Sequence, residues 1–291
     1  MDGGLLAQAV LNGLLLGGIY ALVALGFSLV WGVMNVINVS HGAFVMLGAF
    51  TTYWLFVRVG LDPFLGAPVA MALMFVLGYL LQKYVINLIV RAPMFMTLIL
   101  TFGINLVIVN LGIVAWTGDV RSITTGLSGQ GVVLGPFVVP YVRAATLLIA
   151  LLATTALFVF MDRTRTGSAI RATRMDLLAA EGVGIRIDRI YALTFAIGAA
   201  LAGLAGALIS VTLPITPFMG FTYTGKAFVV TALGGLGNMA GALVGGLVLG
   251  VAETVGAALL GPGYQDAIGY ALLVLILVLR PSGLLGRVGY A

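Results

Sequence analysis

The sequence predicts an all-α protein, a polytopic transmembrane helical bundle of about eight or nine spans with discontinuous or re-entrant segments. Three observations predict this class. Hydrophobic residues make up 62% of the 291-residue chain and charged residues only 8%, against roughly 25% charged in a soluble domain. The mean hydropathy is +1.19. The apolar runs are continuous, without the alternation typical of a membrane β-barrel.

Charge, proline and glycine bound eight apolar runs that are long enough to cross a bilayer as helices. These runs are 5–31, 40–57, 64–82, 94–116, 144–161, 190–212, 240–260 and 266–280. A ninth run near 218–235 is short and contains Lys226, so it is either a full span or a re-entrant segment. The whole chain, 1–291, is expected to form a single transmembrane domain.

The basic residues indicate how the chain is oriented. Placing 162–189, the loop from Lys83 to Arg91, and the C-terminal Arg280 and Arg287 in the cytoplasm puts ten of the 14 basic residues inside. That distribution satisfies the positive-inside rule. The other four would lie outside: Arg58, Arg121, Arg143 and Lys226. The segment 117–143 would also face outward, with room for a small hairpin or a short helix. Such dispersed basic residues argue against nucleic-acid binding.

The chain has 14 basic and nine acidic residues, and ten of these charged residues lie in the segment 162–189. This segment is therefore expected to be a cytoplasmic coupling loop. The part from Ser168 to Glu181 has no proline or glycine, which predicts one short helix with Arg171, Arg174 and Glu181 on one face. A solvated loop is the alternative. The residues expected to contact a partner are Arg171, Arg174, Asp176, Glu181 and Gly182.

Two polar features interrupt the apolar runs. The segment Asn38–Gly42 contains the only histidine, and a helix broken near the midplane can mark a substrate site; a polar turn at the membrane surface is the alternative. Glu253 is the only acid deep in a predicted span, so it should face a cavity or bond to another helix. The candidate substrate pathway is Asn38, Ser40, His41, Gly42 and Glu253.

Several other patterns exclude functions. The stretch Gly220–Ala227 nearly matches a phosphate-binding loop, but Ala227 stands where a hydroxyl would hold Mg²⁺ and no strand precedes it. No arrangement of nucleophile, base and acid is present, so the chain is not expected to be an enzyme. A lone histidine and no cysteine predict no metal site and no cofactor. Small residues four apart, as at Gly13 and Gly17, indicate close helix packing or helices that slide.

Several segments resemble one family from end to end. GLLLGGIYALVALGFSLVWGVMNVINVSHGAFVMLGAF, TGSAIRATRMDLLAAEGVGIRIDRIYALTFAIGAALAGLAGAL, GGLGNMAGALVGGLVLGVAE and LRPSGLLGR resemble the branched-chain amino acid ABC importer permeases of the H type, from the Leu/Ile/Val importers. The resemblance implies a multi-pass subunit of the bacterial inner membrane. It would pair with a second, M-type permease, two cytoplasmic ATPases and a periplasmic binding protein, with a coupling helix within 168–184.

The resemblance leaves the substrate open. Branched-chain, hydrophobic amino acids come first, and urea, short amides, or aromatic and other carboxylic acids are alternatives within the same family. A self-contained secondary transporter or channel is less favoured. In that case Glu253, His41 and Lys226 would couple ions, and the charged segment 162–189 would have no partner to dock.

Overall fold

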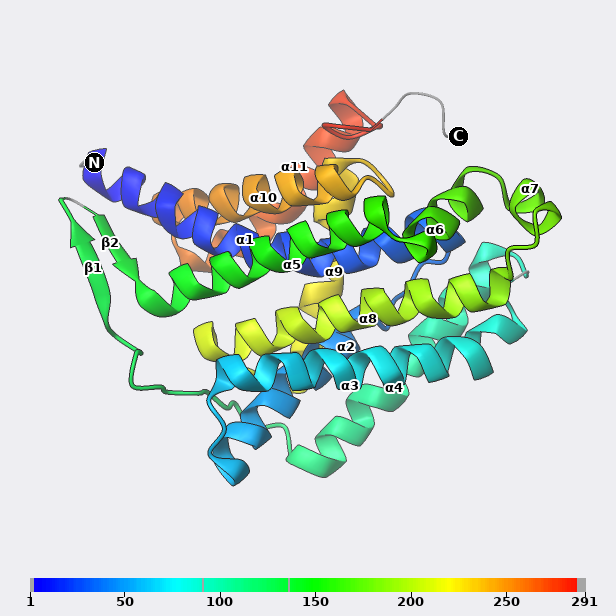
Figure 1. Ribbon diagram of the computed structural model, residues 1–291. Helices are drawn as coiled ribbons and strands as arrows, with labels where there is room; N and C mark the ends of the chain where they lie inside the picture. The colour runs from blue at the N-terminus through cyan, green and yellow to red at the C-terminus, as the bar shows by residue number, and fades with distance from the viewer. Residues whose placement is uncertain (1–2, 91, 136, 287–291) are drawn as a thin grey trace.

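The computed structural model describes residues 3–90, 92–135 and 137–286 as one helical bundle (Figure 1). Arg91 and Arg287, used in the charge count, lie outside these residues. The helices are α1 (Gly3–Met34), α2 (His41–Trp54), α3 (Pro63–Tyr84), α4 (Met94–Trp116), α5 (Tyr141–Arg163), α6 (Arg165–Met175), α7 (Leu177–Gly182), α8 (Ile187–Thr212), α9 (Met219–Gly234), α10 (Met239–Leu260) and α11 (Gln265–Leu279). Short π or 3₁₀ turns cover Leu55–Val59, Ile86–Leu88 and Pro262–Tyr264.

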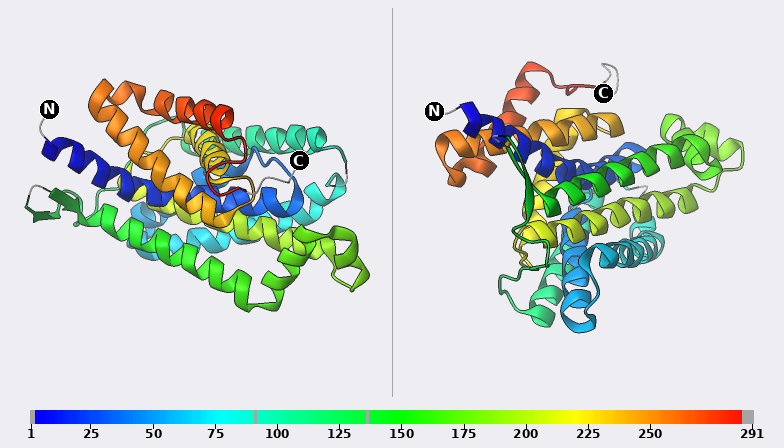
Figure 2. Two further views of the ribbon diagram at one scale, coloured as in Figure 1. Left: turned by 90° about the horizontal axis from the view of Figure 1, so that it is seen from above. Right: turned by 60° about the vertical axis from the view of Figure 1, so that its left-hand side comes forward.

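Eight helical stretches in the described part of the chain are long and apolar enough to cross a membrane, and they coincide with the eight predicted runs. The predicted fold class is therefore confirmed. The ninth run forms α9, which has only 16 residues, or about 24 Å. It crosses the long helices steeply (Figures 1 and 2). It is too short to be counted with those eight stretches, and the choice between a full span and a re-entrant segment stays a prediction.

The bundle is built around α1 and α8. In each of these helices 89% of the most apolar stretch is buried. Helix α1 packs on α10 through glycines four residues apart, and a Cβ added at Gly17 would lie 2.8 Å from the carbonyl oxygen of Gly246. The small-residue spacing thus allows the close backbone approach expected in lipid.

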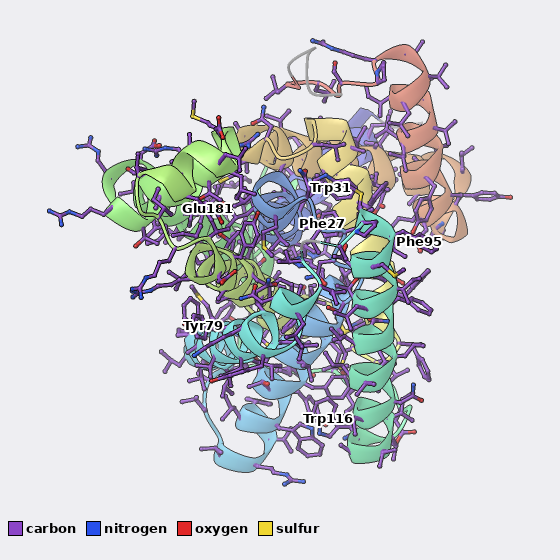
Figure 3. The ribbon with its side chains drawn as sticks, turned by 90° about the vertical axis from the view of Figure 1, so that its right-hand side faces the viewer. Phe27, Trp31, Tyr79, Phe95, Trp116 and Glu181 are labelled. Carbon is purple, nitrogen blue, oxygen red and sulfur yellow. The ribbon has the colours of Figure 1, made fainter. Side chains whose placement is uncertain are left out.

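The outer helices differ from this core. Only 17% of the apolar stretch of α4 and 6% of that of α11 is buried. Figure 3 shows α4 along one side of the bundle, with Phe95 near one end and Trp116 near the other. Trp116 stacks on Phe50 of α2 with the ring centroids 4.5 Å apart, so α4 is held to the bundle along one narrow face.

A β-hairpin marks one end of the bundle. Strands β1 (Gly131–Leu134) and β2 (Phe137–Pro140) pair antiparallel, which agrees with the small hairpin predicted for 117–143. The Gln8 side chain donates to the carbonyl of Val138 and accepts from its N–H, both at 2.9 Å. The N-terminal end of α1 is thereby tied to the hairpin (Figure 1).

The opposite end carries α6 and α7, and here the predicted single helix over 168–181 is wrong. The chain forms two helices that are interrupted at Asp176, whose backbone is extended (φ −154°). Its carboxylate accepts from the N–H of Ala179 at 2.9 Å, because aspartate competes for backbone donors and starts helices readily. Consequently Arg171 and Arg174 lie on α6, whereas Glu181 lies on α7.

The connection from α1 to α2 runs back into the bundle. The ring Nε2 of His41, the first residue of α2, lies 2.9 Å from the carbonyl of Val23, which is about 16 Å before the end of α1 at Met34. Residues 35–40 can span roughly 20 Å when extended, enough to cover that return. Helix α2 therefore begins deep inside the protein, and the predicted helix break is confirmed.

Candidate functional site

The break at 35–42 is held by side chains from two other helices. Thr101 of α4 accepts from the Val39 N–H at 3.2 Å and donates to the Ile37 carbonyl at 2.9 Å. Within the break, Ser40 donates to Asn38 at 2.6 Å. These bonds replace the helical ones that the extended segment lacks, as a bilayer interior requires.

Helix α9 closes the other side of the break. The N–H of Gly42 donates to the hydroxyl of Thr224 at 2.9 Å. Gly42 and Gly220 touch through their backbones, and a Cβ at Gly42 would overlap the carbonyl oxygen of Gly220. Glycine is therefore required at position 42 by the close approach of α2 and α9.

A second polar cluster joins four helices around Glu253, whose side chain is 1% exposed. The ammonium of Lys226 lies 2.6 and 2.7 Å from the two carboxylate oxygens. Tyr20 donates a hydrogen bond of 2.8 Å and Gln265 one of 3.2 Å. The prediction that Glu253 meets an interhelical partner is confirmed, because these donors come from α1, α9 and α11.

Lys226 was counted among the four basic residues expected outside, but it lies buried on α9. Its side chain is 10% exposed, and its ammonium contacts Asp266 at 2.9 Å as well as Glu253. A buried lysine needs such counter-ions. The signal in the sequence was a basic and an acidic residue inside neighbouring apolar runs, each of which would be costly alone.

Helix α9 links the two polar regions, since Thr224 binds the break and Lys226 binds Glu253. Sequence reasoning identified the break and Glu253. It missed the partners Tyr20, Thr101 and Thr224, which come from other helices. Asn38, Ser40 and His41 are at most 2% exposed. They and Glu253 are packed against neighbouring helices, and the hollows described below are lined by other residues.

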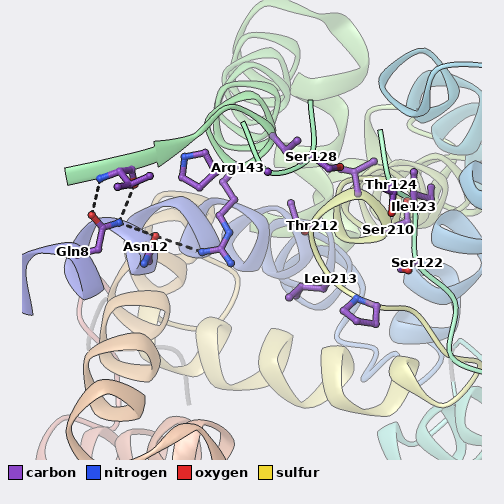
Figure 4. Close-up of a pocket in the computed structure, with 16 residues that line it drawn as sticks. Gln8, Asn12, Ser122, Ile123, Thr124, Ser128, Arg143, Ser210, Thr212 and Leu213 are labelled. Carbon is purple, nitrogen blue, oxygen red and sulfur yellow. Dashed lines mark hydrogen bonds between the residues drawn. The ribbon is translucent and has the colours of Figure 1, made fainter. Parts of the chain in front are cut away.

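A hollow of about 640 Å³ opens at the hairpin end (Figure 4). Arg143 reaches across it to the amide oxygen of Asn12 at 3.4 Å. A second hollow of about 560 Å³ shares Gln8, Asn12 and Arg143 with the first and continues to Thr254 and Gln265. Gln265 also bonds to Glu253, so this second hollow reaches the edge of the buried cluster.

The candidate coupling residues occupy different positions on α6 and α7. Arg171 pairs with Asp162 at 2.7 Å, and Arg174 lies beside Gly237 in the turn between α9 and α10. Asp176 caps α7, which ends at Gly182. Glu181 lines a polar hollow of about 420 Å³ that also contains Lys83 and residues at the start of α8.

Exposed apolar side chains surround these charges. Met175, Leu178 and Val183 are 83%, 78% and 79% exposed. They project from the end of the bundle that carries the charged segment. Leu178 and Val183 were not among the predicted contact residues, although apolar residues inside a charged segment can indicate a contact surface.

The stretch that resembled a phosphate-binding loop is also resolved. Gly220–Lys226 is part of α9, whereas a phosphate cradle needs a loop whose N–H groups point toward the anion. In α9 the N–H groups of this stretch lie along the helix axis and do not form such a loop. Lys226 is moreover occupied by two carboxylates.

This bundle of apolar helices, with polar contacts buried at a broken helix, defines the class of multi-pass helical membrane transport proteins. The family model described as the permease component of the branched-chain amino acid transport system matches residues 9–277. The chain belongs to this family of permeases.

The relatives cover nearly the whole chain. The protein named high-affinity branched-chain amino acid transport system permease protein BraD of Pseudomonas aeruginosa is 34% identical over 96% of this chain and 95% of its own. The similarly named LivH of Escherichia coli K12 is 34% identical over 96% and 95%. LivM of Salmonella typhimurium is 28% identical over 92% of this chain and 68% of its own. No solved structure matches significantly.

Proposed function

We propose that this chain is the transmembrane permease subunit of a binding-protein-dependent ABC importer that moves branched-chain amino acids across the bacterial inner membrane. The observation that carries the proposal is the match along 96% of the chain to permeases named for that transport. The chain itself would catalyse no reaction, because ATP hydrolysis would belong to separate subunits.

The proposed complex has three kinds of partner. The first is a second permease subunit, and the resemblance to LivM as well as to LivH supports a pair of related permeases. The others are two cytoplasmic ATPases and a periplasmic substrate-binding protein. These two follow from the family alone. The lipid bilayer covers the remaining apolar surface.

We place α6 and α7 in the cytoplasm and the β-hairpin outside. The support is the charge asymmetry together with the separation of these elements at opposite ends of the bundle (Figure 1). Single cysteines at Ser168 and Gly126 would test it, since the chain has none. In intact cells, a membrane-impermeant thiol reagent should label position 126 and leave position 168 unlabelled. Labelling of 168 alone would invert the orientation.

The ATPase would bind the α6–α7 segment, with Arg171, Arg174, Asp176, Glu181 and Gly182 shaping it. The exposed apolar side chains of Met175, Leu178 and Val183 would add apolar area to that contact. Because Arg174 lies beside Gly237, movement of α6 would reach the turn between α9 and α10 directly. Helix α9 would transmit it to the break at 35–42.

A substitution of Leu178 tests this contact. A charge at a buried apolar contact costs several kcal/mol, so Leu178→Asp should lower uptake at least about tenfold while ATP hydrolysis loses its dependence on the binding protein. Leu178→Met is the matched control and should transport normally. Normal uptake by Leu178→Asp, in a complex assembled at the usual level, would contradict the docking.

The substrate would pass close to Asn38, Ser40, His41 and Gly42 at the break and to Glu253. Both regions put polar groups inside the membrane, where they are costly unless they serve a pathway or a contact. Reconstitution of the complete importer in proteoliposomes tests the function as a whole. ATP-dependent uptake of radiolabelled leucine, competed by isoleucine and valine, is expected. Uptake of urea or an aromatic acid without leucine would overturn the proposed substrate.

A further inference from the structure

The ion-pair cluster of Lys226, Glu253 and Asp266 has two carboxylates and one ammonium, so it has one negative charge in excess. Lys226 already meets both oxygens of Glu253 at 2.6 and 2.7 Å. A second carboxylate, Asp266, lies 2.9 Å from the same ammonium. Formally, one lysine with two carboxylates leaves a net charge of −1, and the excess charge lies on the exposed Asp266 in the first turn of α11.

The two carboxylates differ in access. Glu253 is 1% exposed, whereas the Asp266 side chain is 62% exposed. Glu253 is also saturated by Tyr20 and Gln265. The Glu253–Lys226 contact is therefore closed, while the Asp266–Lys226 contact is open to a molecule arriving beside α11.

The cluster lies partway across the membrane. Glu253 is 14 residues from the start of α10 at Met239, and Tyr20 is 14 residues from the end of α1 at Met34. Both distances correspond to about 21 Å from the same end of the bundle. Asp266 is the second residue of α11, so the open contact lies toward the turn between α10 and α11, the side that a molecule arriving from the hairpin end would reach first.

Apolar ring surface lies beside this contact. Tyr270 follows Asp266 by one helical turn, is 44% exposed, and has its hydroxyl against Gly225, next to Lys226. Phe221, one turn before Gly225 on α9, is 70% exposed. An ion pair bordered by exposed rings matches a molecule that has two opposite charges and an apolar side chain.

We propose that the Lys226–Asp266 contact is a transient subsite for the zwitterionic end of the amino acid. The α-carboxylate of the substrate would take the place of Asp266 at Lys226, and the α-ammonium would bind Asp266. No bond forms or breaks, and one ion pair is exchanged for two. Lys226 keeps Glu253 throughout, so no charge is left unpaired at any point.

This subsite selects against the other candidate substrates. Urea and short amides have no charge with which to compensate Asp266. A carboxylic acid would bind Lys226 but would offer no cation to Asp266, so only one of the two ion pairs would form. The inference rests on the proposed function and deepens it, because it explains at the level of the permease why zwitterions pass.

A binding experiment uses the purified permease complex without its binding protein. The reporter is a single cysteine at the exposed position 267, in the variant Ala267→Cys. Millimolar leucine should slow modification of this cysteine by a small thiol reagent several-fold. Two fragments of leucine serve as probes: 4-methylpentanoate, which lacks the ammonium, and 3-methylbutylamine, which lacks the carboxylate. Neither should protect. Equal protection by either fragment, or no protection by leucine, would overturn the inference.

Substitution of Asp266 separates binding from stability. In the Ala267→Cys reporter variant, the further substitution Asp266→Asn should abolish the protection by leucine. Asp266→Glu in its place should retain part of the protection. Asp119→Asn removes a carboxylate in the loop before the hairpin and should leave protection intact. In the complete importer, Asp266→Asn should lower leucine uptake about tenfold, the value of one charge-assisted hydrogen bond, with an unchanged thermal midpoint.

The outcomes distinguish the two proposals. If the unaltered importer takes up leucine and Asp266→Asn takes it up equally fast, the subsite is wrong and the proposed function stands. If the unaltered importer takes up no leucine while accepting another solute, the proposed function fails, and the subsite fails with it. If Asp266→Asn lowers uptake only in proportion to a loss of assembled complex, Asp266 is structural and the subsite is overturned.

Discussion

Two ion pairs of nearly equal length occupy opposite environments in this protein. Lys226 and Glu253 lie 2.6 Å apart with side chains 10% and 1% exposed, whereas Arg171 and Asp162 lie 2.7 Å apart with side chains 40% and 70% exposed. Water solvates either partner of the second pair when it separates. The partners of the first pair are shielded from water and depend on protein groups alone: each other, Asp266 for Lys226, and Tyr20 and Gln265 for Glu253. Equal geometry therefore predicts unequal consequences. Glu253→Ala and Asp162→Asn test that difference directly, and two further substitutions place a buried packing contact and an exposed helix cap between them.

The largest effect is expected at the buried pair. Glu253→Ala leaves the Lys226 ammonium with the partly exposed Asp266 as its remaining carboxylate, and breaking a buried pair costs about 3–5 kcal/mol. The thermal midpoint of the purified subunit in detergent should fall strongly. Adding Lys226→Met should recover much of the loss, since it removes the ammonium that has lost its buried partner and is left with a partly exposed one. A single variant as stable as the native protein would contradict the role of burial.

The next largest effect is expected at Gly42, where the substitution changes packing and leaves charge unaltered. Gly42→Ala would push its Cβ into the carbonyl of Gly220, and overpacking of this kind costs about 1–3 kcal/mol. Gly103→Ala is the matched control, because no atom lies within 4 Å of its added Cβ. That variant should be neutral or stabilised by roughly 0.5–1 kcal/mol, since glycine weakens a helix interior. Equal losses in thermal midpoint would rule out the close approach of α2 and α9.

A smaller effect is expected in the exposed segment. Asp176→Ala removes the cap of α7, which costs about 1 kcal/mol locally. Amide hydrogen exchange over 177–182 should become faster, while exchange in α1 and α8 stays as it was. Asp176→Asn keeps a capping oxygen and should preserve the protection. Uniform acceleration along the chain would instead indicate a global role for this residue.

The smallest effect is expected at the exposed pair. Asp162→Asn removes the partner of Arg171, and a solvent-exposed pair contributes about 0–1 kcal/mol. The thermal midpoint should shift by a degree or two at low salt, on the order expected for such an energy, and by less at high salt. A shift comparable to that of Glu253→Ala would remove the contrast between the two pairs.

The sequence predicted the class and the span boundaries because continuous apolar runs have one physical solution, a helix in lipid. It also located the break near Gly42 and the importance of Glu253. It could not identify Tyr20 and Thr224 as partners, since each is an ordinary residue of its own helix and acquires its role from a neighbour distant in sequence. The single helix expected over 168–181 failed because the capping ability of Asp176 outweighed the absence of proline and glycine.

The roles of the pathway and coupling residues remain predictions. The geometry adds what the sequence could not supply: Arg171 is tied to Asp162, whereas Leu178 and Val183 project outward. Charge density in the sequence indicated the correct segment. Arg174, Asp176 and Glu181 are exposed as well, so charged and apolar side chains share the surface that this segment offers to a partner.

The position of Lys226 also constrains how the protein is made. Helix α9 leaves the ribosome before α10, and the carboxylate that balances its lysine follows 27 residues later. A helix of 16 residues that contains a lysine is a poor candidate for independent entry into lipid, where one such charge costs about 2.5–3.5 kcal/mol. We therefore expect α9 to settle in the membrane together with α10, which carries the carboxylate that balances its lysine.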